Sequence, residues 1–432
     1  MQASIFEKNI LNKKHVVIIG AGFGGLQAVK KLSKEKCLNV TLIDKKNHHL
    51  FQPLLYQVAT AVLSPADIAI PTRSLMHRKK NVTILMDEVT SIDIKNKIIV
   101  LEDKEISYDY LILAAGARTG YFGKTDYMKY TYGLKNLQDA LRIRNKILTS
   151  FEEAENHPEN AEKLLKFIII GGGPTGVELA GSIAELSNHI IREEFRNIDT
   201  SKADIKLIEA SSDLLATFNR ELSVYTKLRL EKRNVRVILN TRVIKIEPNK
   251  VFVKGIEGEN EFEASLIIWT AGVEAVPLTI DTGLPVGRNN RLKVNRYCSF
   301  DNHPEIFAIG DIAEFSEGGK ILPGVSAVAM QEGRYAARAI IDEIKGREKK
   351  PFIYFDKGNM ATIGRKDAVA ELGGFKLTGF MGWLMWLFVH LFYQVGFKNK
   401  ISILITWIWS YITFGAAARV IQEPLTEKDL KI

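Results

Sequence analysis

Short apolar runs that end at glycine recur along the chain. Residues 15–19 (HVVII) form such a run and continue directly into GAGFGG. Residues 26–32 then have helix-like apolar spacing, and a second apolar run at 39–43 ends at Asp44. Apolar runs without polar alternation are typical of strands buried on both faces of a parallel sheet. The pattern therefore predicts a strand, a helix and a second, parallel strand.

The same order of elements returns in the middle of the chain. Residues 167–170 (FIII) precede GGGPTG, a helical segment runs from 177 to about 194, and a strand at 205–208 ends at Glu209. The two units lie about 150 residues apart, which is close to the usual size of a domain. We therefore predict an α/β fold with two Rossmann-like dinucleotide-binding domains.

Three further apolar strands would complete these domains. Residues 110–116 and 266–272 each end in a turn of small residues, and 306–311 ends in Gly-Asp. Doubly wound sheets bind ligands at the carboxyl ends of their strands, which makes Asp311 a candidate ligand-binding residue. We predict four parts: a first domain in two pieces (1–120 and 276–345), a second domain (121–275) and a C-terminal membrane-attachment region (346–432).

The first glycine motif has the spacing GxGxxG, with Gly20, Gly22 and Gly25. These glycines allow a tight turn, close approach of the backbone to a diphosphate, and close packing of helix on strand. Asp44 stands where a carboxylate binds a ribose hydroxyl in such units. The context predicts a dinucleotide site, although glycine turns also occur for packing and Asp44 could be a strand-end turn residue.

The second motif repeats this spacing with Gly171, Gly173 and Gly176, and Glu209 ends the next strand. An acidic residue there accepts hydrogen bonds from a 2′-hydroxyl and repels a 2′-phosphate, so it favours NADH over NADPH. The interval from Gly171 to Glu209 is longer than usual, and an extended helix and loop around 187–202 would account for it.

Two other polar positions leave alternatives open. Glu178 follows Gly176 by two residues, in the first turn of the predicted helix, where a carboxylate also stabilises the helix through its dipole. His48 and His49 have no carboxylate or cysteine at ligand spacing, so we interpret them as loop histidines and expect no metal.

The C-terminal part contains two strongly apolar stretches, 377–395 and 401–420, joined by GFKNK. They form a transmembrane hairpin, a pair of helices in the membrane interface, or a buried helical pair. A hairpin would carry Lys398 and Lys400 across the membrane, against the positive-inside rule. Four of the five tryptophans lie here, and polar residues gather near one face of each stretch. Both features favour interfacial helices.

Composition narrows the function classes. The net charge of +9 is compatible with nucleic acid, an anionic membrane or an anionic ligand. The basic runs are short and lack interleaved aromatics, which argues against a nucleic-acid surface. Cys37 and Cys298 lie far apart, which argues against disulfides and zinc. No apolar stretch of signal-peptide length precedes the first strand, so we expect the folded body to face the cytoplasm.

The motifs together resemble type II NADH:quinone oxidoreductases over nearly the whole chain. The resemblance is carried by the two glycine motifs in this order, the loop NHHLFQPLLYQVA, GGGPTGVELAG, FAIGD and the aromatic tail with HLFYQVGFKNK and WIWSYITFGAAARVI. It implies FAD in the first site and NADH in the second. It also implies a quinone, menaquinone or ubiquinone, that reaches the flavin from the membrane side.

The resemblance also implies roles for single residues. Gly20, Gly22, Gly25 and Asp44 would hold the FAD diphosphate and ribose, with Asp311 on the ribitol side and Gln52 near the flavin ring. Glu178 matches the acidic residue of GVELAG that couples nicotinamide and flavin to the quinone. In the AQxAxQxG motif, Ala327 replaces the first glutamine and Gln331 keeps the second. Glu178 and Gln331 are thus the candidate catalytic residues.

We expect two-electron reduction of quinone to quinol without proton pumping, at the cytoplasmic face of the cell membrane. Two alternatives stay open. A sulfide:quinone oxidoreductase would need a pair of cysteines near the flavin, which the positions of Cys37 and Cys298 argue against. A non-catalytic NADH sensor would bind nucleotide without turnover. The sequence leaves open which quinone is used and whether the chain forms a homodimer.

Overall fold

The computed structural model describes residues 13–413, 415 and 418–421, which fall into two compact units. Unit 1 comprises residues 1–50, 69–120 and 273–356. Unit 2 comprises residues 51–68, 121–272 and 357–432. Each unit contains one of the two glycine motifs. The four-part division given above stays a prediction, because these units group the C-terminal part with the second nucleotide motif.

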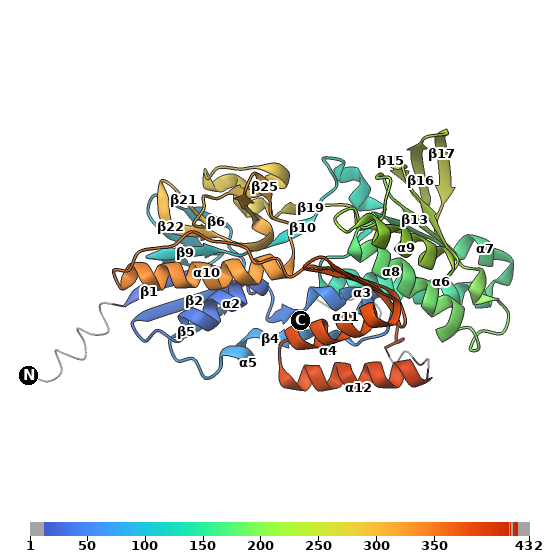
Figure 1. The fold of residues 1–432 in the computed structure, drawn as a ribbon, viewed down its shortest axis with the longest axis horizontal. Coiled ribbons are helices and arrows are strands. Elements are labelled where there is room, and N and C mark those ends of the chain that lie inside the picture. The colour runs from blue at the N-terminus through green and yellow to red at the C-terminus, as the bar shows by residue number, and fades with distance from the viewer. Residues whose placement is uncertain (1–12, 414, 416–417, 422–432) are drawn as a thin grey trace, which may run out of the picture. The chain divides into compact units, whose positions relative to one another are not determined.

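Unit 1 is built on a six-stranded sheet (Figure 1). Its inner strands run parallel to one another, and their apolar residues are buried on both faces. This confirms the strands predicted at 15–19, 39–43, 110–116 and 306–311. The order is β21 (Ser299–Phe300), β22 (His303–Ala308), β9 (Tyr110–Leu113), β1 (Lys14–Ile19), β2 (Leu38–Asp44) and β5 (Val82–Met86).

Two helices of unit 1 lie side by side, α2 (Phe23–Leu32) and α10 (Ser326–Ile344) (Figure 1). They approach so closely that a Cβ atom on Gly333 would lie 2.2 Å from the carbonyl oxygen of Gly24. The smaller elements of unit 1 are β3 (His48–Leu50), β4 (Ala69–Pro71), α5 (Thr72–Met76), β6 (Ser91–Asp93), β7 (Ile98–Val100), β8 (Glu105–Ser107), β10 (Ala117–Thr119), β19 (Val273–Ala275), β20 (Leu292–Lys293), β23 (Ala313–Glu314), β24 (Ser316–Glu317) and β25 (Lys320–Ile321).

Unit 2 contains a five-stranded parallel sheet. Its order is β11 (Tyr132–Gly133), β18 (Leu266–Trp269), β12 (Lys166–Ile170), β13 (Asp204–Ile208) and β14 (Val235–Ile238). The strands predicted at 167–170, 205–208 and 266–272 are confirmed. The unit's other elements before the C-terminal part are α3 (Leu55–Ala59), α4 (Pro65–Ile68), α6 (Leu137–Asn156), α7 (Ala161–Leu164), α8 (Pro174–Glu185), α9 (Arg220–Glu231), β15 (Arg242–Glu247), β16 (Lys250–Gly255) and β17 (Gly258–Glu263).

The C-terminal part of unit 2 begins with a three-stranded antiparallel sheet, β26 (Asn359–Gly364), β27 (Asp367–Leu372) and β28 (Phe375–Thr378). An ion-pair cluster joins it to α9: Asp367, 1% exposed, lies 2.5 Å from Arg229 and 3.0 Å from Arg233. Because Asp367 is buried, the two arginines offset the cost of burying its carboxylate.

Two helices follow, α11 (Gly379–Tyr393) and α12 (Phe397–Thr413), which lie side by side (Figure 1). Segment 51–68 holds α12 through Asp67, whose carboxylate accepts a 2.7 Å hydrogen bond from Ser402. Asn399 and Gln394 donate to the carbonyl oxygen of Asp67. These polar residues thus face the protein, together with Trp383, Trp386, Ile403 and Trp407, while many other apolar side chains of the two helices are exposed.

Candidate active site

The first glycine turn joins β1 to α2. Gly20 has a φ of +104°, a conformation that favours glycine, and a Cβ atom on Gly25 would lie 1.8 Å from the carbonyl oxygen of Gly20. A Cβ atom on Gly22 would meet nothing within 4 Å. The backbone at the N-terminus of α2 is therefore open to a ligand, and this geometry fits the diphosphate of a dinucleotide.

Asp44, at the end of β2, is tied into this turn. One carboxylate oxygen accepts the Ala21 N–H at 2.6 Å and the other accepts the Lys46 N–H at 2.8 Å. A carboxylate oxygen has two lone pairs, so each retains acceptor capacity for a ribose hydroxyl. Asp44 stabilises the strand-end turn and still fits the predicted role.

The second glycine turn repeats this arrangement between β12 and α8. Gly171 has a φ of +112°, Gly173 has open space at its Cβ position, and a Cβ atom on Gly176 would lie 1.9 Å from the Gly171 carbonyl oxygen. Glu209 accepts the Gly172 N–H at 2.5 Å and the Ser211 N–H at 2.8 Å. The two turns therefore present the same acceptors and donors to a dinucleotide.

The extra length before Glu209 has a structural explanation. Helix α8 ends at Glu185 and continues as a π-helical turn, Leu186–Ile190, and a 3-10 turn, Thr200–Lys202, follows before β13. The extended helix and loop predicted around 187–202 are thus present.

Asp311 and His49, both in unit 1, were assigned a place from the sequence. Asp311 lies in a 3-10 turn directly after β22, at the carboxyl end of the strand. His49 is not in a loop: it lies in β3 with its ring 1% exposed, and its Nδ1 atom bonds to the Ala21 carbonyl oxygen at 2.9 Å. The loop interpretation of His48 and His49 was wrong, because pairing of β3 with β4 draws both into a short ladder.

A buried glutamate that the sequence pattern did not reveal holds the 3-10 turn that contains Asp311. Glu332 on α10 is 1% exposed and accepts the Gly310 N–H at 2.5 Å. Burial raises its pKa to about 8, and Asp311 adds to the rise while Arg291 opposes it.

Glu178 lies in the second turn of α8, two residues after Gly176, and not in the first turn as predicted. It accepts a long hydrogen bond, 3.4 Å, from the Thr362 N–H of β26. Burial raises the pKa of Glu178 to about 8, against smaller opposing effects of the Thr362 amide and the Trp386 indole. The indole N–H of Trp386 has no hydrogen-bond partner, so its effect on the pKa of Glu178 comes from its proximity to the carboxyl group. A pKa of about 8 leaves the carboxyl group of Glu178 mostly protonated at neutral pH.

Aromatic residues from distant segments surround Glu178. Burial and the charge of Glu178 raise the pKa of Tyr56 well above its usual value, so Tyr56 stays neutral. Gln57 connects this tyrosine to α12, because its amide donates to the Tyr56 hydroxyl at 3.0 Å and accepts the Trp407 N–H at 2.8 Å. No sequence pattern could have grouped these residues, since they come from α3, α11, α12 and β26.

His390 is stacked on Trp386 with ring centroids 4.2 Å apart, and its Nδ1 atom bonds to the Trp386 carbonyl oxygen. Burial lowers the pKa of His390 to about 4, so the ring is neutral at physiological pH. The surroundings of Glu178 in unit 2 are therefore aromatic and low in charge, which suits an apolar ring such as a quinone.

Gln331 and Gln52 have their amides engaged. The Gln331 amide forms two 3.0 Å hydrogen bonds with the backbone of Phe355, one as donor and one as acceptor. Gln52 lies in a 3-10 turn and donates to the Lys135 carbonyl oxygen at 3.2 Å. Both amides thus hold neighbouring backbone.

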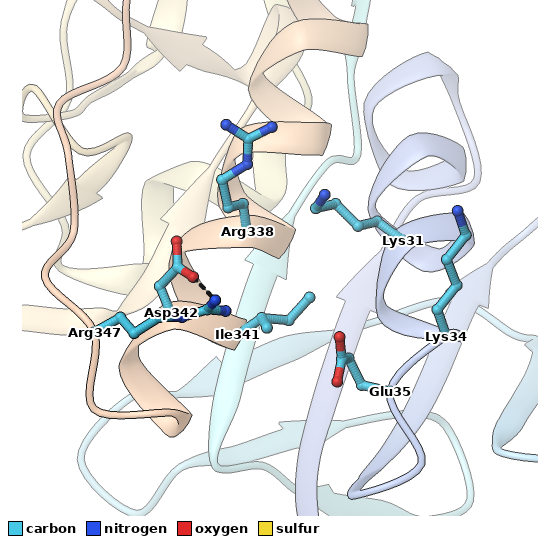
Figure 2. Close-up of a pocket in the computed structure, with 7 residues that line it drawn as sticks. All are labelled: Lys31, Lys34, Glu35, Arg338, Ile341, Asp342 and Arg347. Atoms are coloured by element: carbon cyan, nitrogen blue, oxygen red, sulfur yellow. Dashed lines mark ion pairs between the residues drawn. The ribbon is translucent and has the colours of Figure 1, made fainter.

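A pocket of about 310 Å³ lies elsewhere on unit 1 (Figure 2). Arg338 and Lys31 extend their side chains on the same side of it, and Arg347 pairs with Asp342 at 2.7 Å (Figure 2). It lies at the C-terminal ends of α2 and α10, whereas the glycine turn is at the N-terminus of α2, so it is not the dinucleotide site. Its lining residues are Lys31, Lys34, Glu35, Arg338, Ile341, Asp342 and Arg347.

Comparison with known proteins decides the family. A family model described as pyridine nucleotide-disulphide oxidoreductase matches residues 14–333, and a model of the NDH2 C-terminal domain matches residues 357–415. The chain is 41% identical to the type II NADH:quinone oxidoreductase Ndh of Mycobacterium tuberculosis, over 93% of this chain and 89% of that protein. This chain belongs to the type II NADH:quinone oxidoreductases.

Solved structures share the fold. NDH2 from Plasmodium falciparum in complex with NADH superposes with a TM-score of 0.86 at 24% identity, covering 95% of this chain and 100% of that one. The sulfide:quinone oxidoreductase of Aquifex aeolicus also matches, with a TM-score of 0.71 at 19% identity over 94% of this chain and 92% of that one. The fold alone would not separate the two activities, but the sequence relationship to type II NADH:quinone oxidoreductases does.

Two further observations bear on this family assignment. Cys298 is fully buried and burial raises the pKa of its thiol, while Cys37 is exposed, so the two cysteines do not form the close pair that the sulfide:quinone alternative would need. Among the residues that the structure describes, we find no helix with the length and hydrophobicity needed to cross a bilayer.

Proposed function

We propose that Glu178 is the proton donor in an enzyme that oxidises NADH through FAD and reduces a quinone to quinol. The enzyme's activity and cofactors follow from its family. The observation that carries the proposal is a protonated carboxyl group one turn beyond the second nucleotide turn, among neutral aromatic side chains.

The reaction consumes one proton from solution, because NADH, one proton and quinone give NAD⁺ and quinol. Bound FAD supplies the redox chemistry, by accepting a hydride and passing on two electrons. The protein must therefore place a proton donor in an apolar site. With a pKa of about 8, Glu178 is protonated at neutral pH and can be protonated again after each turnover.

Binding of the two dinucleotides is assigned to the two glycine turns. Gly20, Gly22, Gly25 and Asp44 would hold FAD, and Gly171, Gly173, Gly176 and Glu209 would hold NADH. The open Cβ positions of Gly22 and Gly173 support this assignment, since a diphosphate must approach the backbone there. Asp311 and Gln52 would contact the ribitol and the flavin ring. Gln331 would position the segment around Phe355 beside the flavin.

Helices α11 and α12 would attach the protein to the cytoplasmic face of the cell membrane. Apolar side chains on both helices are exposed, and burying them in the interface would stabilise the attached state. Lys398 and Lys400, which follow the turn between the helices, would add attraction to anionic lipid. The exposed side chains are Phe380, Met381, Leu384, Phe388, Phe392, Phe397, Ile401, Leu404, Ile405, Ile408, Trp409 and Ile412.

One experiment tests the activity directly. The absorption spectrum of the purified protein is recorded alone, after NADH and then after a quinone. We expect a flavin spectrum that bleaches with NADH and recovers with quinone. Bleaching without recovery would contradict quinone reduction, and binding of NADH without bleaching would favour a sensor.

A further inference from the structure

Helix α8 carries three polar residues on one face: Glu178, Ser182 and Glu185. Their spacing of four and three residues places them in line along the helix. At 1.5 Å per residue, the line is about 10 Å long. It begins beside the second nucleotide turn and leads away from it, toward the C-terminal end of the helix.

The C-terminal sheet covers this line. At one end Glu178 accepts the Thr362 N–H, and at the other end Glu185 accepts the Arg365 N–H at 3.0 Å. Between them the helix packs so closely on β26 that a Cβ atom on Gly181 would lie 1.9 Å from the Ile363 carbonyl oxygen. The packing leaves Glu178, Ser182 and Glu185 partly buried along the edge of the contact between the helix and the sheet.

A hydroxyl pair lies between the two carboxylates. The Ser182 hydroxyl and the Thr60 hydroxyl are 2.7 Å apart, and either can donate to the other. When the Thr60 hydroxyl donates its proton to the Tyr56 carbonyl oxygen, Ser182 is the donor within the pair. Hydroxyl groups of this kind transfer protons because each both donates and accepts.

The charges around the line suit a mobile proton. Burial raises the pKa of Glu185, while the Arg365 amide and the guanidinium groups of Arg365 and Arg233 oppose this. Glu178 faces the neutral Tyr56, and Glu185 faces Tyr411, whose pKa burial raises above its usual value. Glu185 is itself only partly buried, as is the neighbouring Arg365, so this end of the line reaches solvent.

We propose that Glu185 is a proton-relay residue that passes protons from solvent near Arg365, through the Ser182–Thr60 hydroxyl pair, to Glu178. The proposal rests on the function proposed above. In each turnover Glu178 gives one proton to the reduced quinone, Glu185 replaces it through the hydroxyls, and solvent reprotonates Glu185. Every group regains the proton it lost, and no other reactant is needed.

The test measures the two half-reactions separately in the intact Glu185→Gln enzyme. Anaerobic reduction of the flavin by NADH should keep its wild-type rate. Oxidation of the reduced enzyme by quinone should slow at least tenfold, with the largest effect at high pH, and small weak acids such as formic acid should restore part of the rate. Glu185→Asp should retain more activity than Glu185→Gln.

Glu193→Gln is the control, because Glu193 is exposed and lies eight residues further along the chain. It should match wild type in both half-reactions.

A second measurement needs no turnover. The infrared band of protonated carboxyl groups, followed as a function of pH in protein without NADH or quinone, should lose one titrating component in Glu185→Gln. Ser182→Ala should leave this band intact but slow the quinone step.

Three outcomes would overturn the relay. These are an unchanged quinone step in Glu185→Gln, equal slowing of both half-reactions without rescue by weak acid, and an unchanged infrared titration. Failure of the wild-type protein to reduce quinone would instead refute the proposed function, so the two failures are distinguishable.

Discussion

At the scale of single residues, the protonation of Glu178 controls the pH dependence. We expect the quinone step of the wild-type enzyme to slow as the pH rises through about 8, because the carboxyl group then loses its proton. In Glu178→Gln this dependence should disappear and the quinone step should slow by about 10²-fold, the usual contribution of a general acid. Reduction of the flavin by NADH should be little changed. Stopped-flow measurements across a pH series check both, and an identical pH profile in the variant would assign the dependence to another group.

Some site residues could be predicted from the sequence, whereas the surroundings of Glu178 could not. The glycines and the carboxylates Asp44 and Glu209 follow a local spacing, and the structure places them as that spacing implies. The environment of Glu178 could not be predicted, because Tyr56, Thr362 and Trp386 reach it from segments far apart in the chain. Burial raises the pKa of Glu178, and burial is a property of the packed structure.

Cofactor preference is a second property of one residue. Glu209 should favour NADH over NADPH, because its carboxylate would repel a 2′-phosphate. Glu209 also accepts the Gly172 and Ser211 N–H groups, so Glu209→Ala would disturb the turn as well as the ligand. Glu209→Gln is the cleaner variant, since its amide oxygen still accepts a hydrogen bond. We expect its ratio of kcat/KM for NADH over NADPH to fall, and equal use of both nucleotides by wild type would contradict the assignment.

At the scale of elements, the C-terminal sheet depends on Asp367. In Asp367→Ala, Arg229 and Arg233 lose their buried partner, and breaking a buried ion pair in this way lowers the free energy of unfolding by about 3 kcal/mol. Chemical denaturation measures the loss. Lys376→Ala is the control, because its ion pair with the exposed Glu221 should contribute less than about 1 kcal/mol. Equal stability of the two variants would show that Asp367 does not anchor the sheet.

The two C-terminal helices were predicted from their composition, but their orientation was not. Polar residues gathered on one face suggested contact with lipid headgroups. In the structure that face includes Ser402 and Gln394, which bond to Asp67 instead. A sequence pattern gives the two faces of a helix, whereas the partner of each face depends on the rest of the fold.

The proposed membrane attachment concerns the whole molecule. Ile405→Glu and Ile412→Glu each place a charge on the exposed apolar side of α12, where the wild-type side chains are 60% and 74% exposed. We expect weaker binding to vesicles that contain anionic lipid, with FAD content unchanged. Sedimentation with vesicles measures this. Ile256→Glu, at an 84% exposed position between β16 and β17, is the matched control and should bind as wild type does. Equal loss in all three variants would contradict attachment through α12.

The exposed apolar sides of α11 and α12 also affect how the purified protein should behave in water. In water these surfaces can be covered by detergent or by the same surfaces of a second copy, and the second arrangement removes apolar area from water without lipid. The oligomeric state measured after purification should therefore change with detergent concentration. A dimer that persists across that range would have to use a different surface of the molecule.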